Sequence, residues 1–257
     1  MKDLSSFKIE VLGCPMHAIS CHKTVELVRE KILEGNFIQH VVVNAAKIVH
    51  MSSDPKLKES VTSCDIINID GMGVVWGARL LGHKVPERVS GIDLFHELLA
   101  MSASNGLSVY LLGATDEIVS QTAKTLHALY PNITIAGYHH GYFWDNEEAM
   151  VEKIRASGAK LLFVAITSPK KENFINRWKD QLGANFVMGV GGTFDVVAGK
   201  VKRAPIWMQN CGLEWFYRVI QEPGRMWKRY LTTNTIFAWI LLKEKIKKIL
   251  GRFYISN

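Results

Sequence analysis

Short apolar runs alternate with amphipathic stretches over residues 1–190 of the chain. Most of the runs are continuously apolar, which is typical of strands that are covered on both faces. The expected strands are residues 7–12, 40–44, 66–70, 108–112, 133–138, 161–166 and 186–190. The amphipathic stretches predict helices over residues 24–33, 92–104, 117–129, 147–156 and 171–181. Because strands that alternate with helices need crossover connections, the pattern predicts an α/β fold with a Rossmann-like, mainly parallel sheet flanked by helices.

The pattern changes after residue 199, where tryptophans and basic residues become interleaved. A continuous apolar run over residues 236–242 is far shorter than the roughly 20 residues that span a bilayer, and lysines follow it. This pattern suits a helix lying in the membrane interface, although a helix packed on the domain with a charged outer face would show it too. We therefore divide the chain into a Rossmann-like catalytic domain, residues 1–199, and a basic, helical, membrane-associating appendage, residues 200–257.

The charged residues, like the apolar ones, are distributed differently before and after residue 199. The chain has a net charge of +7, and residues 200–257 hold 12 lysines and arginines against three glutamates. The basic excess therefore lies in the appendage and indicates an anionic partner. Its tryptophans favour an anionic membrane surface and no nucleic acid, although a non-enzymatic polyanion-binding protein stays an alternative. If the appendage docks only at the membrane, its surface would allow homo-oligomers in solution.

The cysteines and the N-terminus indicate the compartment. Four scattered cysteines without a CxxC pair are typical of a reduced protein. The N-terminal residues contain no apolar run with a cleavage site, so we expect no signal peptide. The predicted location is the cytoplasm, peripheral on the inner face of the cell membrane.

Polar side chains follow two of the expected strands, and parallel sheets bind ligands at the carboxyl ends of their strands. Asn44 follows one strand, and Asp70 follows the next, directly before Gly71-Met72-Gly73. A carboxylate at this place could take the proton from an attacking hydroxyl, although an Asp before Gly is also a common turn or cap residue. Arg88 precedes an expected helix, where a guanidinium and free N–H groups together would hold a phosphate.

Three further strand-to-helix loops are candidates for binding a nucleotide, because small residues let a nucleotide approach the backbone and lysines at a helix start favour a pyrophosphate. The candidate residues are Gly113, Ala114, Thr115, Ser168, Lys170, Lys171, Glu172, Gly191, Gly192 and Asp195. A nucleotide-dependent oxidoreductase stays an alternative, but the chain has no GxGxxG in its first loop. There is no DxD, and Cys14, His17, Cys21 and His22 do not converge as zinc ligands, so we expect no metal and no cofactor.

Taken in order, these loops lie in VVVNAAKIVHMS, CDIINIDGMGVVWGARLLG, PERVSGIDL, VYLLGAT, TSPKKE and GVGGTFDVVAGKVKRAPIWMQNCGLEWFYRVIQEPGRMWKRY. Over residues 8–230 they resemble the WecG/TagA/CpsF family of glycosyltransferases. The resemblance implies a Rossmann-like core, an appendage that engages the membrane, and inverting, metal-independent transfer from a UDP-sugar donor. The sugar would be of the N-acetylmannosamine, N-acetylmannosaminuronic acid, glucose or glucuronate type. The acceptor would be a saccharide linked to undecaprenyl or another polyprenyl diphosphate, used in cell-surface polysaccharide synthesis.

The resemblance also implies roles for single residues. Asp70 matches the family's proposed catalytic base, and Asn44 and Arg88 match active-site residues. The appendage would complete the diphosphate site with arginines, for which the candidates are Arg203, Arg218, Arg225 and Arg229. Two positions depart from the family pattern, because Val42 stands where Thr is common and Lys171 where Gln is usual. A cation at residue 171 leaves the identity of the donor sugar open.

Overall fold

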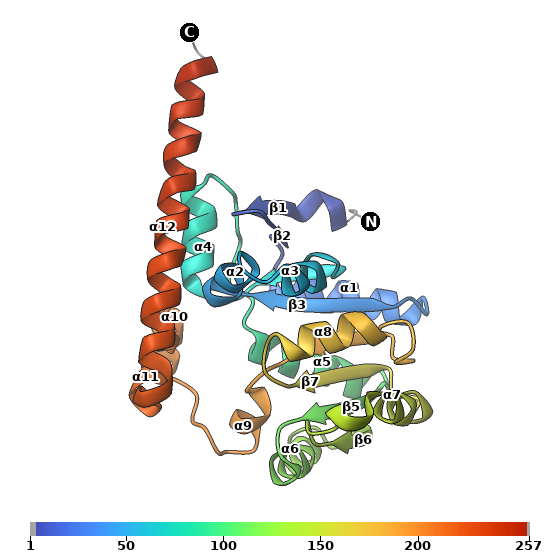
Figure 1. The fold of residues 1–257 in the computed structure, drawn as a ribbon. Coiled ribbons are helices and arrows are strands. Elements are labelled where there is room, and N and C mark those ends of the chain that lie inside the picture. Colours follow the sequence, from blue (N-terminus) through green and yellow to red (C-terminus); the bar gives the residue numbers. More distant parts are fainter. Residues whose placement is uncertain (1–3, 256–257) are drawn as a thin grey trace.

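The computed structural model describes the backbone of residues 4–255 and the side chains of residues 4–250 except Arg225. Within these residues six parallel strands form one sheet in the order β4-β3-β8-β7-β5-β6 (Figure 1). The strands are β3 (Ile38–Val43), β4 (Ile66–Ile69), β5 (Ser108–Gly113), β6 (Thr134–His139), β7 (Leu161–Ala165) and β8 (Phe186–Gly189). The α/β, Rossmann-like fold expected from the sequence is therefore confirmed.

Helices cover both faces of the sheet, and successive residues of each strand face opposite helices. Leu161 and Phe163 of β7 pack with α1 (Cys21–Leu33), α5 (Gly91–Ser104) and α6 (Asp116–Leu129). Leu162 and Val164 pack on the other face with α7 (Glu147–Ala156) and α8 (Lys170–Trp178). Because both sets of side chains are buried, the strands read as continuous apolar runs in the sequence.

The first expected strand is present, but it does not join the parallel sheet. After the short 3-10 helix η1 (Leu4–Phe7), β1 (Lys8–Val11) pairs in antiparallel register with β2 (Cys14–His17). The turn residues Leu12 and Gly13 have φ values of 54° and 72°, a turn that matches the twist of a hairpin. The His17 ring accepts a 3.0 Å hydrogen bond from the Ile67 N–H, so the hairpin covers the edge strand β4.

Three short helices near β3 and β4 were not expected: α2 (Ala45–Met51), α3 (Pro55–Thr62) and α4 (Met72–Leu80). Asn44 caps α2 by accepting a 3.0 Å bond from the Lys47 N–H, and Asp54 caps α3 in the same way through Leu57. Nearly all of α2 is buried, so it shows no polar face. Amphipathic periodicity therefore could not reveal it.

The appendage consists of helices that lie against one side of the domain (Figure 1). After α9 (Thr193–Val197), the chain forms α10 (Ile206–Asn210), α11 (Glu214–Gln221) and the long α12 (Pro223–Ile255). Phe237 of α12 is buried in the cluster around α2 and α4, and a Cβ on Gly77 of α4 would lie 3.3 Å from its ring. The close approach of α4 to α12 therefore depends on glycine at residue 77.

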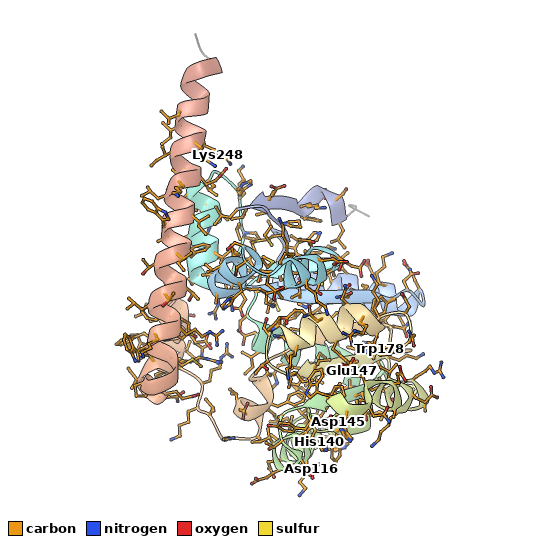
Figure 2. The ribbon with its side chains drawn as sticks, in the orientation of Figure 1. Asp116, His140, Asp145, Glu147, Trp178 and Lys248 are labelled. Atoms are coloured by element: carbon orange, nitrogen blue, oxygen red, sulfur yellow. The ribbon has the colours of Figure 1, made fainter. Side chains whose placement is uncertain are left out.

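The far part of α12 holds the end of α4. Lys245 donates a hydrogen bond to the carbonyl of Leu80, and Lys248, which is labelled in Figure 2, donates one to the carbonyl of Leu81. Positive groups at a helix C-terminus also complement its dipole. One face of α12 thus packs on the domain. The sequence pattern allowed this packing as the alternative to a helix lying in the membrane interface. In the described part of the chain, each helix is too short or too polar to cross a membrane. The division of the chain at residue 199 stays a prediction.

The Gly113→Ala variant should lose stability, because Gly113 has a φ of 132° and a Cβ there would lie 2.3 Å from the Ala165 carbonyl oxygen. We expect the free energy of unfolding to fall by about 3 kcal/mol or more, as for other steric conflicts with fixed backbone. Gly106→Ala is the control, since φ is 62° there and the Cβ would meet no atom within 4 Å. It should cost about 1 kcal/mol. Urea unfolding measures both, and equal losses would show that the Ala165 backbone yields easily.

Candidate active site

Asp70 and Asn44 lie side by side at the carboxyl edge of the sheet. The Asp70 N–H donates a 2.8 Å bond to the Val43 carbonyl, which extends the pairing of β3 with β4 by one residue. A Cβ on Gly71, where φ is 97°, would lie 3.6 Å from the Cβ of Asn44. Because the two strands are parallel and in register, the residues that follow them are brought together.

Arg88 lies next to Asp70, because its loop runs back along the end of β4. The Val89 N–H donates a 2.8 Å bond to the Ile69 carbonyl. Two residues later, the Gly91 N–H at the start of α5 donates to the Asp70 carboxylate. Asp70 therefore accepts a backbone N–H from the first turn of α5, a helix distant in the chain, and also faces a guanidinium, whereas the helix that follows it, α4, has Gly71 as its N-cap and no side-chain cap bond.

Burial raises the pKa of the Asp70 carboxyl above its usual range, and this effect exceeds the opposing effects of Arg88, the Gly91 N–H and Arg218. Glu214, which comes from the appendage, raises the pKa of Asp70 further. The side chain keeps partial access to solvent. A carboxylate with a raised pKa and an open side is a stronger general base than an exposed one.

The appendage brings several of its charged residues to Asp70. Arg218 of α11 reaches the loop after β8, since a Cβ on Gly192 would lie 4.0 Å from its Nη1 and 3.9 Å from Asp195 Oδ2. Burial raises the pKa of the Tyr230 phenol on α12. The charges of Arg218 and Arg229 lower this pKa, and those of Glu214 and Asp70 raise it. The predicted residues Arg218 and Arg229 thus lie in one electrostatic neighbourhood with Asp70.

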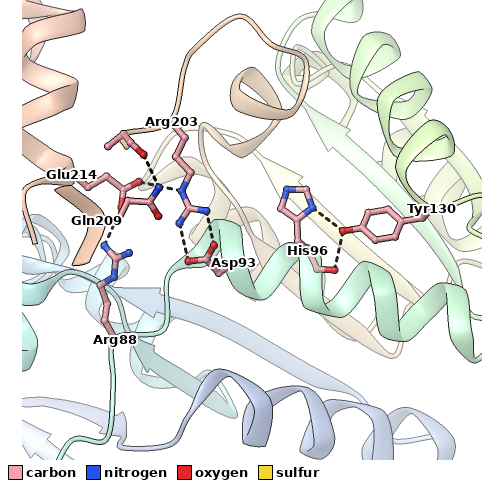
Figure 3. Close-up of polar contacts among 8 residues, drawn as sticks. Arg88, Asp93, His96, Tyr130, Arg203, Gln209 and Glu214 are labelled. Carbon is pink, nitrogen blue, oxygen red and sulfur yellow. Dashed lines mark hydrogen bonds and ion pairs between the residues drawn. The ribbon is translucent and has the colours of Figure 1, made fainter. Parts of the chain in front are cut away.

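Arg203 and Glu214 connect the appendage to the loop that carries Arg88 (Figure 3). Arg203 holds Asp93 of α5 with two bonds of 2.5 and 2.8 Å, and Arg88 Nη1 lies 3.0 Å from Glu214 Oε2. The sequence analysis did not identify Glu214 or Tyr230. The scarcity of acidic residues in the appendage was the available signal for Glu214. The side chain of Arg225 lies outside the described residues.

The loops after β5, β6 and β7 form a second group at the same edge of the sheet. The Ala114 N–H donates to the Ala165 carbonyl and the Gly141 N–H to the Ala114 carbonyl, both at 2.9 Å. Thr115 caps α6, and the exposed Lys170 lies 4.9 Å from the Trp144 ring centroid. Ser168 is exposed beside Lys170. Strands β3 and β8 separate this group from Asp70, which leaves the width of two strands along the edge.

Lys171 and Glu172 are buried under the edge and do not line its surface. Glu172 Oε1 lies 2.8 Å from Lys47 Nζ and 2.9 Å from Lys171 Nζ. Burial alone would raise the pKa of Glu172, but the two lysines hold it at about 2. Burial and the neighbouring Lys47 lower the pKa of Lys171 to about 8. Lys47 also donates to the carbonyl of Val42, so this triad joins α2, α8 and the end of β3.

No three His, Cys, Asp or Glu side chains gather as metal ligands in the part of the chain whose side chains are described. The expectation of a reaction without metal or cofactor stays a prediction, because the comparisons and the structure do not test it.

The sequence model of the Glycosyl transferase WecG/TagA/CpsF family matches residues 9–250. The chain belongs to this family. It is 37% identical over 188 residues to a Bacillus subtilis protein, covering 73% of each chain, and that protein is named N-acetylglucosaminyldiphosphoundecaprenol N-acetyl-beta-D-mannosaminyltransferase. A Bacillus spizizenii protein of the same name is 35% identical over 212 residues, which cover 82% of this chain and 81% of the relative. The protein is therefore a glycosyltransferase, and the oxidoreductase and non-enzymatic alternatives no longer apply.

The Lys171→Gln variant tests the buried triad. The pKa of Lys171 is about 8 in the folded chain and 10.5 ordinarily, so between these values the unfolded chain binds more protons and stability rises with pH. At pH 7 the variant should therefore be more stable than the wild type, by about 1–3 kcal/mol, and the gain should vanish near pH 10.

Chemical denaturation from pH 7 to pH 10 measures this difference. Lys170→Gln is the matched control, because Lys170 is exposed and should show little change at any pH. A lower stability of Lys171→Gln at pH 7 would show that the buried charge is stabilising overall.

Proposed function

We propose that this glycosyltransferase moves N-acetylmannosamine from a UDP-linked donor to an N-acetylglucosamine linked to undecaprenyl diphosphate, in cell-surface polysaccharide synthesis. The names of the two Bacillus relatives support the sugar and the acceptor. The observation that carries the mechanism is the placement of Asp70, a partly open carboxylate of raised pKa with Arg88 and Arg218 beside it. This arrangement suits proton removal next to a group that gains negative charge.

The proposed reaction is a single displacement with inversion. Asp70 takes the proton of the acceptor hydroxyl, and the acceptor oxygen attacks the anomeric carbon. The bond from that carbon to the UDP oxygen breaks, and UDP leaves with the electron pair. Arg88 and the appendage arginines Arg218 and Arg229 stabilise the charge that grows on the diphosphate. The carboxamide oxygen of Asn44 caps α2, which leaves the NH₂ group to contact a substrate oxygen.

The nucleotide is proposed to lie along the loops after β5, β7 and β8. Gly113, Ala114 and Thr115 offer backbone at the start of α6, and Ser168 and Lys170 lie at the exposed start of α8. The N-termini of these helices favour anions. Gly192 lies next to Asp195 and Arg218, and Gly191 precedes it in the same loop. Lys171 and Glu172 support this edge from below through the triad with Lys47.

The outer surface of the appendage supports a peripheral place on the inner face of the cell membrane, where a polyprenyl acceptor resides. Large apolar side chains are exposed along α10, α11 and α12, namely Ile206, Trp207, Trp215, Phe216, Ile220, Trp227, Leu231, Ile236, Trp239, Leu242, Ile246, Ile249 and Leu250. Exposed lysines on α12, including Lys228, Lys243 and Lys247, accompany them. Aromatic and cationic side chains on one helix suit the headgroup region of an anionic bilayer.

The Asp70→Asn variant should lose at least about a hundredfold in kcat while donor binding is kept, because the amide cannot accept the proton. Its stability should not fall, since the raised pKa shows that the charged carboxylate is unfavourable in the folded chain. Transfer from UDP-N-acetylmannosamine to the lipid-linked acceptor and thermal unfolding measure the two effects. Asp180→Asn, an exposed change beyond α8, is the control. Unaltered transfer by Asp70→Asn would exclude Asp70 as the base.

Replacing Trp239 and Leu242 of α12 by serine should weaken membrane binding. Their side chains are 57% and 50% exposed, so the fold should be kept while apolar contact with lipid is lost. We expect partitioning onto phosphatidylglycerol vesicles to fall about tenfold or more in a sedimentation assay. Tyr142→Ser, which alters a side chain 69% exposed in the segment after β6, at the opposite end of the strand order from β4, is the control. If the double variant sediments like the wild type, the outer face of α12 does not bind the membrane.

A further inference from the structure

Four charged side chains of alternating sign form a chain between the appendage and the domain (Figure 3). Arg88 Nη1 lies 3.0 Å from Glu214 Oε2, and Glu214 Oε1 lies 3.7 Å from Arg203 Nε. Arg203 then grips both oxygens of Asp93. Arg88 and Asp93 belong to the loop and first turn of α5, whereas Arg203 and Glu214 belong to the appendage. The chain therefore crosses twice between the two parts.

The link between Arg88 and Glu214 is shielded from water. The side chains of Arg88 and Glu214 are 13% and 18% exposed, unlike most surface ion pairs. Charge pairs with so little exposure are screened weakly, and removing one partner leaves the other charge uncompensated. The connector between Arg203 and Glu214 is also fastened, because Gln209 donates a 2.6 Å bond to the Ala204 carbonyl. Glu214 itself is held by Arg88 from the domain and by Arg203 from the connector.

We propose that Glu214 is a positioning residue of the active site, whose carboxylate joins Arg88 to Arg203 and so holds the appendage and its arginines against Asp70. This inference rests on the proposed function for Asp70, but the contact itself does not depend on the reaction. Glu214 opens α11, and Arg218 lies one turn further along the same helix. Fixing Glu214 therefore also fixes the guanidinium that reaches Gly192.

Glu214 also contributes to the charge around Asp70. The groups that face Asp70 are Arg88 and the Gly91 N–H from the α5 loop, and Glu214 and Arg218 from α11. Arg203 and Tyr230 interact with Asp70 electrostatically from the connector and α12. Among these groups Glu214 carries a negative charge and raises the pKa of Asp70. A neutral residue at 214 should therefore lower the pKa of the proposed base.

The first experiment measures the attachment of α11 without using the reaction. In Glu214→Ala, amide hydrogen exchange across residues 214–221 should become about tenfold faster, because Arg88 is left without its partner and neither Arg88 nor Arg203 any longer holds the helix. Glu244→Gln, a change of a different glutamate within the appendage, is the control and should exchange like the wild type. Unaltered exchange of residues 214–221 in Glu214→Ala would overturn the proposal.

The second experiment uses Glu214→Gln, which keeps the shape of the side chain and its ability to accept a hydrogen bond. The acid limb of kcat/KM against pH should move to lower pH, by about half a unit. A residue that served the fold alone would lower activity at every pH without moving the limb. Where the acid limb reports Asp70, the proposal requires the shift in the limb as well as the faster exchange.

The dependence of kcat/KM on pH in Asp70→Asn separates the proposal that Asp70 is the base from the proposal that Glu214 positions the site. If the residual transfer of Asp70→Asn keeps the acid limb, the proposed base is wrong, and hydrogen exchange alone decides the role of Glu214. If Asp70→Asn loses the limb and Glu214→Gln leaves it at the wild-type pH, the base is supported and the role of Glu214 is overturned.

Discussion

The carboxylate of Asp70 lies where burial and positive partners act against each other. Burial at the end of β4 raises its pKa, while Arg88, Arg218 and the Gly91 N–H favour the charged form. The balance keeps a basic carboxylate at a place that solvent reaches. Arg88 and Gly91 come from the α5 loop and Arg218 from the appendage, so the fold has to bring β4, this loop and the appendage together before this environment exists.

Three buried charged side chains under the carboxyl edge connect the helices that border the site. The triad of Lys47, Glu172 and Lys171 has side chains no more than 8% exposed, and it holds two lysines around one carboxylate. Apolar residues of the same shape would pack there with a smaller desolvation cost. The triad instead joins α2, which Asn44 caps, to α8, which opens beside Ser168 and Lys170.

The long helix α12 packs one face on the domain and leaves large apolar side chains exposed on the other. Phe237 and Thr233 lie against the domain at 5% and 4% exposure, and Trp239 and Leu242 point outward. The inward face places Tyr230 near Asp70, while the outward face carries the proposed membrane contact. An appendage built in this way would orient the site toward an acceptor held at the bilayer surface.

The sequence by itself determined the sheet and the residues at its edge. Apolar runs identified the six parallel strands, most of them continuous because strands covered on both faces have no polar side, and strand direction then placed Asn44 and Asp70 at one edge. It did not show that residues 7–12 form a separate hairpin, since pairing partners are chosen by a turn and by contacts with β4. It also missed the buried helix α2, whose apolar surface has no period, and it assigned Lys171 to the surface. Only the tertiary structure decided that Glu214 meets Arg88 and that Lys47 meets Glu172. Those contacts join segments distant in the chain, and the free energy of a buried ion pair depends on how the surrounding fold excludes water.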